Sequence, residues 1–145
     1  MTKTHEFIRK ALRGEAPAPP IAQLLGFALT EVGPGRAVIA FEAGPQHANP
    51  MGTLHGGVLC DIADAAMGVA YAATLDDGET FTTLELKINF LRPVWTGTLT
   101  ATGRVVKAGH TVGLVECDIV DDKDRLVARA SSTCLTLRGE QAEGR

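Results

Sequence analysis

Several features are scarce in this sequence, and each scarcity argues against a class of protein. The 145 residues include only three cysteines, Cys60, Cys117 and Cys134, each inside an apolar run and without the spacing of metal ligands. We therefore expect reduced cysteines, a cytoplasmic location and no metal. Lys and Arg number 14 against 17 Asp and Glu, so the basic surface of a nucleic-acid-binding protein is not expected.

Long apolar runs are also missing. The first ten residues are broken by charge every few positions, which argues against the apolar segment of a signal peptide. The longest weakly charged stretch, residues 58–75, is interrupted by two aspartates and falls short of the roughly 18 uninterrupted apolar residues that a membrane span needs. We expect no membrane partner. Internal repeats and low-complexity linkers are absent as well.

What is present suits one globular domain. A chain of 145 residues with 45% hydrophobic content can bury a sizeable core but has little room for two domains. Gly14, Pro17, Pro19 and Pro20 separate a short N-terminal helix, expected at residues 6–12, from the rest. We divide the chain into an N-terminal extension (1–20), one domain (21–138) and a polar, frayed tail (139–145).

The pattern of strands and turns predicts an α+β domain. Residues 27–32 and 36–42 have strand composition and flank the turn sequence Gly33-Pro34-Gly35, which predicts a hairpin. The strongest period-2 alternation lies at 82–90, and three later strands at 97–107, 111–121 and 125–137 should form an antiparallel meander. We expect a single curved antiparallel sheet wrapped around one long central helix. Apolar residues in both phases of the last strands predict that another subunit covers the outer face.

The central helix is expected from Gly56 to about residue 75. Its only charged side chains are Asp61 and Asp64, in an otherwise apolar segment. A helix that is apolar nearly all round belongs in a core, where an ionised carboxylate is costly unless it is hydrogen-bonded or used. The two aspartates are therefore either satisfied structurally or part of a working site.

The approach to this helix carries a motif. The order Asn-x-x-Gly-x-x-His-Gly-Gly, with an aspartate nine residues after the histidine, resembles that of the hotdog-fold acyl-CoA thioesterases, in the branch of the phenylacetate-degradation and 4-hydroxybenzoyl-CoA thioesterases. Its residues are Asn49, Gly52, His55, Gly56, Gly57 and Asp64. The resemblance extends over residues 26–137. It implies the hotdog fold and hydrolysis of an aryl- or medium-chain acyl-CoA to the free acid and coenzyme A, which is part of the substrate and not a separate cofactor.

The chemistry of the motif predicts an oligomer. Gly56 and Gly57 open the helix, where free backbone N–H groups and the positive dipole end favour a developing oxyanion, and Asp64 can serve as nucleophile or general base. Eight residues at about 1.5 Å each place Gly56 and Asp64 roughly 12 Å apart along the axis. Because reacting groups must lie within about 3.5 Å of one carbon, Asp64 must come from a second subunit. We expect a homodimer as the minimal unit and a homotetramer overall.

Each site residue has a structural alternative. The resemblance implies that Asp64 is the catalytic carboxylate, although it could be hydrogen-bonded only for structure, and Asp61 is interpreted as structural. His55 either contacts the thioester or holds the loop through its ring. Asn49 either orients substrate or water, as the resemblance implies, or only forms a turn before Pro50.

The remaining candidates are substrate contacts. The resemblance places a hydroxyl near the carboxylate, which would be Thr83, or Thr82 if the register shifts; an ordinary strand threonine is the alternative. Gly57 is expected to contact substrate. Arg92 could bind a phosphate of coenzyme A, although a solvated side chain is the simpler interpretation.

Two other functions fit the same fold. An enoyl-thioester hydratase or dehydratase pairs a histidine with a carboxylate, but the proline-rich approach to its histidine is missing here. A non-catalytic acyl-CoA-binding protein is the second alternative. Five Phe, one Tyr and one Trp do not decide the acyl group, since the sequence does not show which of them meet the substrate.

Overall fold

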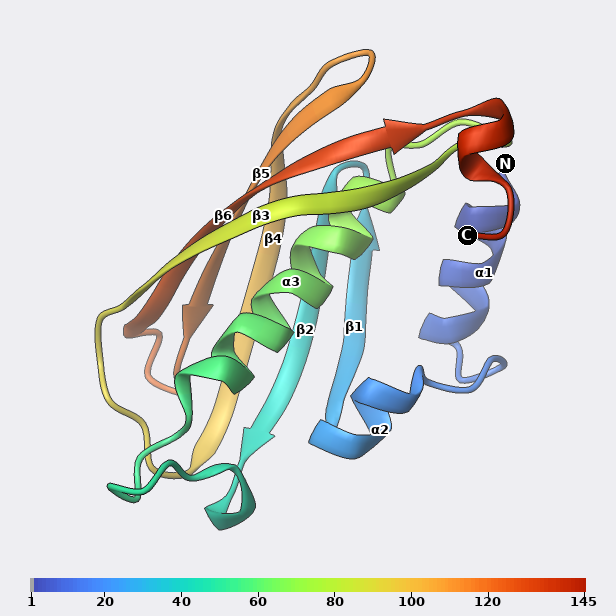
Figure 1. The fold of residues 1–145 in the computed structure, drawn as a ribbon. Coiled ribbons are helices and arrows are strands. Elements are labelled where there is room, and N and C mark those ends of the chain that lie inside the picture. Colours follow the sequence, from blue (N-terminus) through green and yellow to red (C-terminus); the bar gives the residue numbers. More distant parts are fainter. Residues whose placement is uncertain (1) are drawn as a thin grey trace.

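The strands form one six-stranded antiparallel sheet in the order β1-β2-β4-β5-β6-β3, which curves around the helix α3 (Figure 1). The computed structural model describes residues 2–145. The strands are β1 (Phe27–Gly33), β2 (Arg36–Ala43), β3 (Thr80–Phe90), β4 (Gly97–Ala108), β5 (Val112–Val120) and β6 (Leu126–Leu137). The expected sheet around a central helix is therefore confirmed.

The local pairings follow the turn signals of the sequence. Gly35 has φ 63° and closes the β1–β2 hairpin, and β4, β5 and β6 form the expected meander. The alternating strand β3 does not join its neighbour in sequence. It crosses the molecule and pairs with β6, so that β3 and β1 are the two edges of the sheet.

Helix α3 (Gly56–Ala72) lies in the concave face of the sheet. Leu59, Ile62, Ala63, Ala66, Met67 and Tyr71 on this helix are buried in the core. The expectation of a helix buried all round is wrong for a single chain, because Gly57, Asp61 and Asp64 are exposed. Their spacing of four and three residues places them on one stripe of the helix, which borders the edge strand β3 and is open to solvent.

Strand β3 departs from the simple alternation that the sequence predicts. Its pairing with β6 shifts between Thr83 and Glu85, which marks a β-bulge. Leu86 and Ile88 pack on the core, whereas Leu84 and Phe90 are exposed. The alternation of the four apolar residues in 84–90 predicts that they share one face of a half-buried strand. This is wrong for Leu84, which the bulge sets out of phase with the rest. Phe90 stays in phase with Ile88 and lies against Gly56, although it is exposed.

The remaining elements cover the ends of the sheet. Helix α1 (Lys3–Leu12) contacts β1 and α3, and helix α2 (Pro20–Leu25) ends at Gly26 in a left-handed conformation that favours glycine. Short 3₁₀ helices lie at Pro45–His47 (η1) and Gly139–Ala142 (η2). Arg138, the last residue before the tail, forms an ion pair with Glu79 at 2.6 Å, and most of residues 139–145 are exposed. No helix of residues 2–145 is long and apolar enough to cross a membrane.

Gly103 of β4 gives a test of how closely α3 packs on the sheet. A Cβ atom there would lie 2.4 Å from the carbonyl oxygen of Ala66, a backbone atom of α3 that cannot move aside alone. We expect Gly103→Ala to lower the free energy of unfolding by about 1–3 kcal/mol. Chemical denaturation measures it.

Gly33→Ala is the matched control, because its Cβ would meet no atom within 4 Å and its φ is not positive. We expect this variant to unfold at the wild-type midpoint or slightly above, since alanine restricts the unfolded chain. Equal losses in both variants would show that α3 does not press on Gly103.

Candidate active site

His55 caps the N-terminus of α3 and folds its ring back onto the first turn. Its Nδ1 atom accepts a hydrogen bond from the Gly57 N–H at 2.9 Å, and its carbonyl accepts one from the Val58 N–H at 3.0 Å. Because Nδ1 is an acceptor, the proton of the neutral ring lies on Nε2. The Nε2–H group is thus left as a donor at the start of the helix.

The two glycines after His55 have different roles. The Gly57 N–H is occupied by His55, so the expected pair of free N–H groups is reduced to one in this arrangement. Within residues 2–145, the Gly56 N–H has no hydrogen-bond partner. A Cβ at Gly57 would lie 3.0 Å from His55 Nδ1, so any larger residue here would push the ring aside by a few tenths of an ångström. The Gly56 N–H at the positive end of the helix remains for a ligand oxygen.

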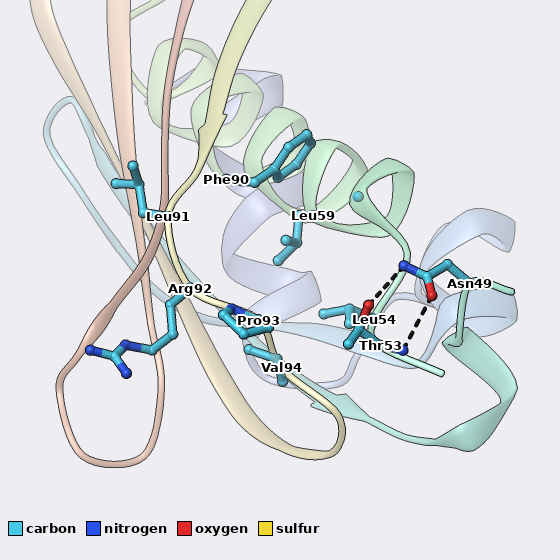
Figure 2. Close-up of a pocket in the computed structure, with 10 residues that line it drawn as sticks. Asn49, Thr53, Leu54, Leu59, Phe90, Leu91, Arg92, Pro93 and Val94 are labelled. Carbon is cyan, nitrogen blue, oxygen red and sulfur yellow. Dashed lines mark hydrogen bonds between the residues drawn. The ribbon is translucent and has the colours of Figure 1, made fainter. Parts of the chain in front are cut away.

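Gly56 opens onto a hollow of about 410 Å³ (Figure 2). Leu54, Leu59, Phe90 and Pro93 give it an apolar wall. The Phe90 ring lies against Gly56, where an added Cβ would be 2.8 Å from its Cζ atom, yet 55% of Phe90 is exposed. The sequence alone allows Phe90 to be either a core residue, the simpler interpretation, or part of an acyl pocket, and the structure places it in the lining of this hollow.

Asn49 and Arg92 lie at opposite sides of this hollow (Figure 2). The Asn49 Nδ2 donates to the Thr53 hydroxyl at 2.8 Å, and its Oδ1 accepts from the Met51 N–H at 2.9 Å and the Thr53 N–H at 3.2 Å. Asn49 therefore holds the turn that leads to His55. The Arg92 guanidinium is exposed and points away from Asn49.

Asp64 lies beside a second hollow, of about 320 Å³, between α3 and β3. Cys60, Asp61, Thr83 and Leu84 also line it. Burial raises the pKa of the Asp64 carboxyl, the Thr83 hydroxyl lowers it through a hydrogen bond, and the charge of Asp61 raises it again, with a net upward shift. Burial also raises the pKa of the Cys60 thiol, which keeps it protonated and a poor nucleophile.

Thr83, and not Thr82, is the hydroxyl near the carboxylate. Thr83 pairs with Cys134 on the inner face of the sheet, and its Oγ1 lies 3.9 Å from the Cys134 Sγ. Thr82, one residue earlier, alternates to the other face and does not line either hollow.

The two hollows share no lining residue. Helix α3 runs without interruption from Gly56 past Asp64, so the two lie about 12 Å apart along its axis. In one chain, the free N–H and the carboxylate therefore cannot meet at the same carbonyl. The first hollow offers a donor that could polarise a carbonyl oxygen, and the second offers a carboxylate that could act as an oxygen nucleophile or a base.

Comparison with known proteins agrees with this geometry. The family model of the Thioesterase superfamily matches residues 51–128. The 1,4-dihydroxy-2-naphthoyl-CoA hydrolase of Listeria monocytogenes is 27% identical over 113 residues, which cover 78% of this chain and 92% of the relative.

Two solved structures are close in fold. The PaaI protein of the E. coli phenylacetic acid degradation operon has a TM-score of 0.81 at 27% identity, covering 90% of this chain and 94% of that one. A phenylacetic acid degradation-related protein of Ralstonia eutropha has a TM-score of 0.80 at 35% identity, covering 88% and 97%. The predicted hotdog fold and thioester hydrolase class are confirmed, and the chain belongs to the Thioesterase superfamily.

Proposed function

We propose that the protein hydrolyses an acyl-CoA thioester in a site shared by two copies of the chain. The observation that carries the proposal is the separation of the free Gly56 N–H and the Asp64 carboxylate into two open hollows on one rigid helix. A two-fold dimer with antiparallel α3 helices would bring Gly56 of one copy opposite Asp64 of the other. Two such sites would form in each dimer.

The carbonyl end of the site is the N-terminus of α3. The thioester oxygen would accept from the Gly56 N–H, and the His55 Nε2–H is a further donor at the same end of the helix, although His55 does not line the hollow. Asn49 contributes indirectly, because its hydrogen bonds to Thr53 fix the turn that leads to His55. This polarisation makes the carbonyl carbon more electrophilic, and the thiolate of coenzyme A is a good leaving group.

Asp64 supplies the nucleophilic oxygen by one of two routes. In the first, its carboxylate attacks the carbonyl carbon, the thiolate leaves, and water then hydrolyses the mixed anhydride to the free acid and Asp64. In the second, it takes a proton from a water molecule that attacks the same carbon. Both routes require the ionised carboxylate, and the Thr83 hydroxyl is placed to orient it.

Exposed surface supports the proposed assembly. The stripe of α3 that carries Asp61 and Asp64 borders the edge strand β3 and is open in a single chain, and β3 itself exposes Leu84 and Phe90. A second copy would cover both. The outer face of the sheet exposes further apolar side chains, which supports a second interface and a homotetramer: Val106, Val112 and Leu114.

The walls of the first hollow suit an apolar acyl group. Leu54, Leu59 and Phe90 beside Gly56 favour an aryl- or medium-chain acyl group, and Arg92 at the rim is free to pair with a phosphate of coenzyme A. The Listeria relative is named as a hydrolase of an aryl-CoA thioester. The proposal includes no metal and no cofactor besides the coenzyme A of the substrate, and three free cysteines suit a reducing, cytoplasmic location.

Replacing Asp64 tests the proposed chemistry. We expect Asp64→Asn to lower kcat by about 10²–10⁴-fold in a thiol-release assay over aryl- and alkyl-CoA substrates, because the amide neither attacks nor accepts a proton. Asp61→Asn, one helical turn away in the same hollow, is the matched control and should keep kcat within about tenfold of wild type at pH 8, where loss of its charge leaves Asp64 ionised. Wild-type turnover by Asp64→Asn on every cleaved substrate would disprove the assignment. Binding of acyl-CoA without cleavage by wild type would favour the binding-protein alternative.

The pH dependence of activity tests the environment of Asp64. Activity should fall as the pH drops through the raised pKa of Asp64, since the protonated acid cannot act. Asp61→Asn removes a charge that raises this pKa, so it should move the acidic limb of the kcat/KM profile to lower pH. Thr83→Val removes a hydroxyl that lowers the pKa and should move the limb to higher pH. Limbs that do not move in either variant would assign the titration to another group.

A further inference from the structure

His47 is a buried histidine whose two ring nitrogens are both used. The side chain is only 7% exposed and lies in the loop between β2 and α3. Its Nδ1 accepts from the Gly44 N–H at 3.0 Å, so the neutral ring carries its proton on Nε2, which lies 2.8 Å from the Leu25 carbonyl oxygen and donates to it. The ring also packs on Phe41, with centroids 4.7 Å apart. The loop is thus fastened to the end of α2, 22 residues earlier.

The backbone of the same residue holds the start of the active site. The His47 carbonyl accepts from the His55 N–H at 2.9 Å, and the His55 ring in turn accepts from the Gly57 N–H. A second hydrogen bond also holds this loop: the Leu54 N–H donates to the Val94 carbonyl at 2.7 Å. A continuous chain of hydrogen bonds therefore runs from Leu25 through His47 to the first turn of α3.

We propose that His47 is a positioning residue for this site: its neutral imidazole clamps the loop between α2 and the β2 end, and so fixes where His55 and Gly56 present their N–H groups. The proposal rests on the proposed function and adds a residue that cannot touch the substrate, since its ring nitrogens are both occupied and buried. This role requires an acceptor for the Gly44 N–H, a donor to the Leu25 carbonyl and a flat ring against Phe41.

Three substitutions separate these requirements. His47→Asn can still accept from Gly44 but is too short for Leu25, whereas His47→Gln can still reach the Leu25 carbonyl. His47→Phe keeps a flat ring against Phe41 and makes neither bond. His110→Gln is the matched control, because His110 lies exposed in the β4–β5 turn, away from both hollows.

The test combines kinetics with amide hydrogen exchange, well below each variant's unfolding midpoint. We expect His47→Phe to speed exchange of the His55 and Gly57 amides at least about tenfold relative to the middle of α3, since local opening frees these bonds. A misplaced site should lower kcat by about ten- to a hundredfold, with a smaller change in KM. His47→Gln should recover more than His47→Asn, and His110→Gln should match wild type.

Several results would overturn the proposal. Wild-type exchange at His55 and Gly57 in a folded His47→Phe variant would do so, as would faster exchange with an unchanged kcat. If His47→Phe does not fold, the comparison of His47→Gln with His47→Asn decides, and equal behaviour of the two contradicts the clamp. Exchange is measured without substrate, so a failure of the clamp is distinguishable from an absence of thioesterase activity in wild type.

Discussion

The fixed rise of an α-helix is the constraint on which the function of this molecule depends. A thioester carbonyl needs a donor for its oxygen and a nucleophile for its carbon within a few ångströms of one another. The chain provides both on α3, but eight residues of unbroken helix hold Gly56 and Asp64 about 12 Å apart. Bending the helix would disrupt the core packing of Ile62, Ala63 and Ala66, which are fully buried. The proposed remedy is a second copy of the helix running in the opposite direction.

The exposed stripe of α3 follows from the same constraint. In a single chain, Asp61 and Asp64 are solvated, which avoids the cost of burying two carboxylates in a core. The protein around Asp64 already raises its pKa. A partner that covered this stripe would remove more water, so the carboxylate would become more basic where the chemistry needs it. Stability favours the solvated charge in the free chain, and in the proposed dimer the same charge would serve the reaction.

Much of the fold could be predicted from sequence because its signals are local. The Gly33-Pro34-Gly35 turn, the short separators of the last three strands and the apolar helix depend on residues close in the chain. The crossing of β3 to the far edge of the sheet depends on long-range pairing with β6, which no local pattern contains. The bulge after Thr83 is likewise absent from the local pattern, so the exposure of Leu84 could not be predicted.

The candidate site was predictable as a motif but not as a set of hydrogen bonds. The spacing of His55, Gly56 and Asp64 predicted the two halves of the site and their separation. It did not reveal that the His55 ring accepts a hydrogen bond from the Gly57 N–H. Nor did it reveal that the Asn49 side chain forms its hydrogen bonds within the turn. The exposure of Asp61 and Asp64 could be predicted from their spacing, since with Gly57 they form one stripe of the helix. The apolar composition of the rest of the helix predicted burial on all sides and so concealed this stripe. His47 gave no signal, because its partners Leu25 and Gly44 are backbone groups.

Activity in mixed dimers tests most directly whether two chains share the site. Gly56→Pro removes the N–H and adds a contact with Phe90, but it leaves the start of the helix intact, because proline is tolerated at the first helical position and His55 (φ −64°, ψ 131°) already has the extended conformation preferred before proline. Gly56→Ala, which keeps the N–H but adds a similar contact with Phe90, is its control.

In purified heterodimers of Gly56→Pro with Asp64→Asn chains, a shared site predicts that one of the two sites is intact and that about half of the wild-type turnover returns. Heterodimers of a doubly substituted chain with a wild-type chain should then be inactive. The reverse pattern, with activity only when one chain is entirely wild type, would contradict the account.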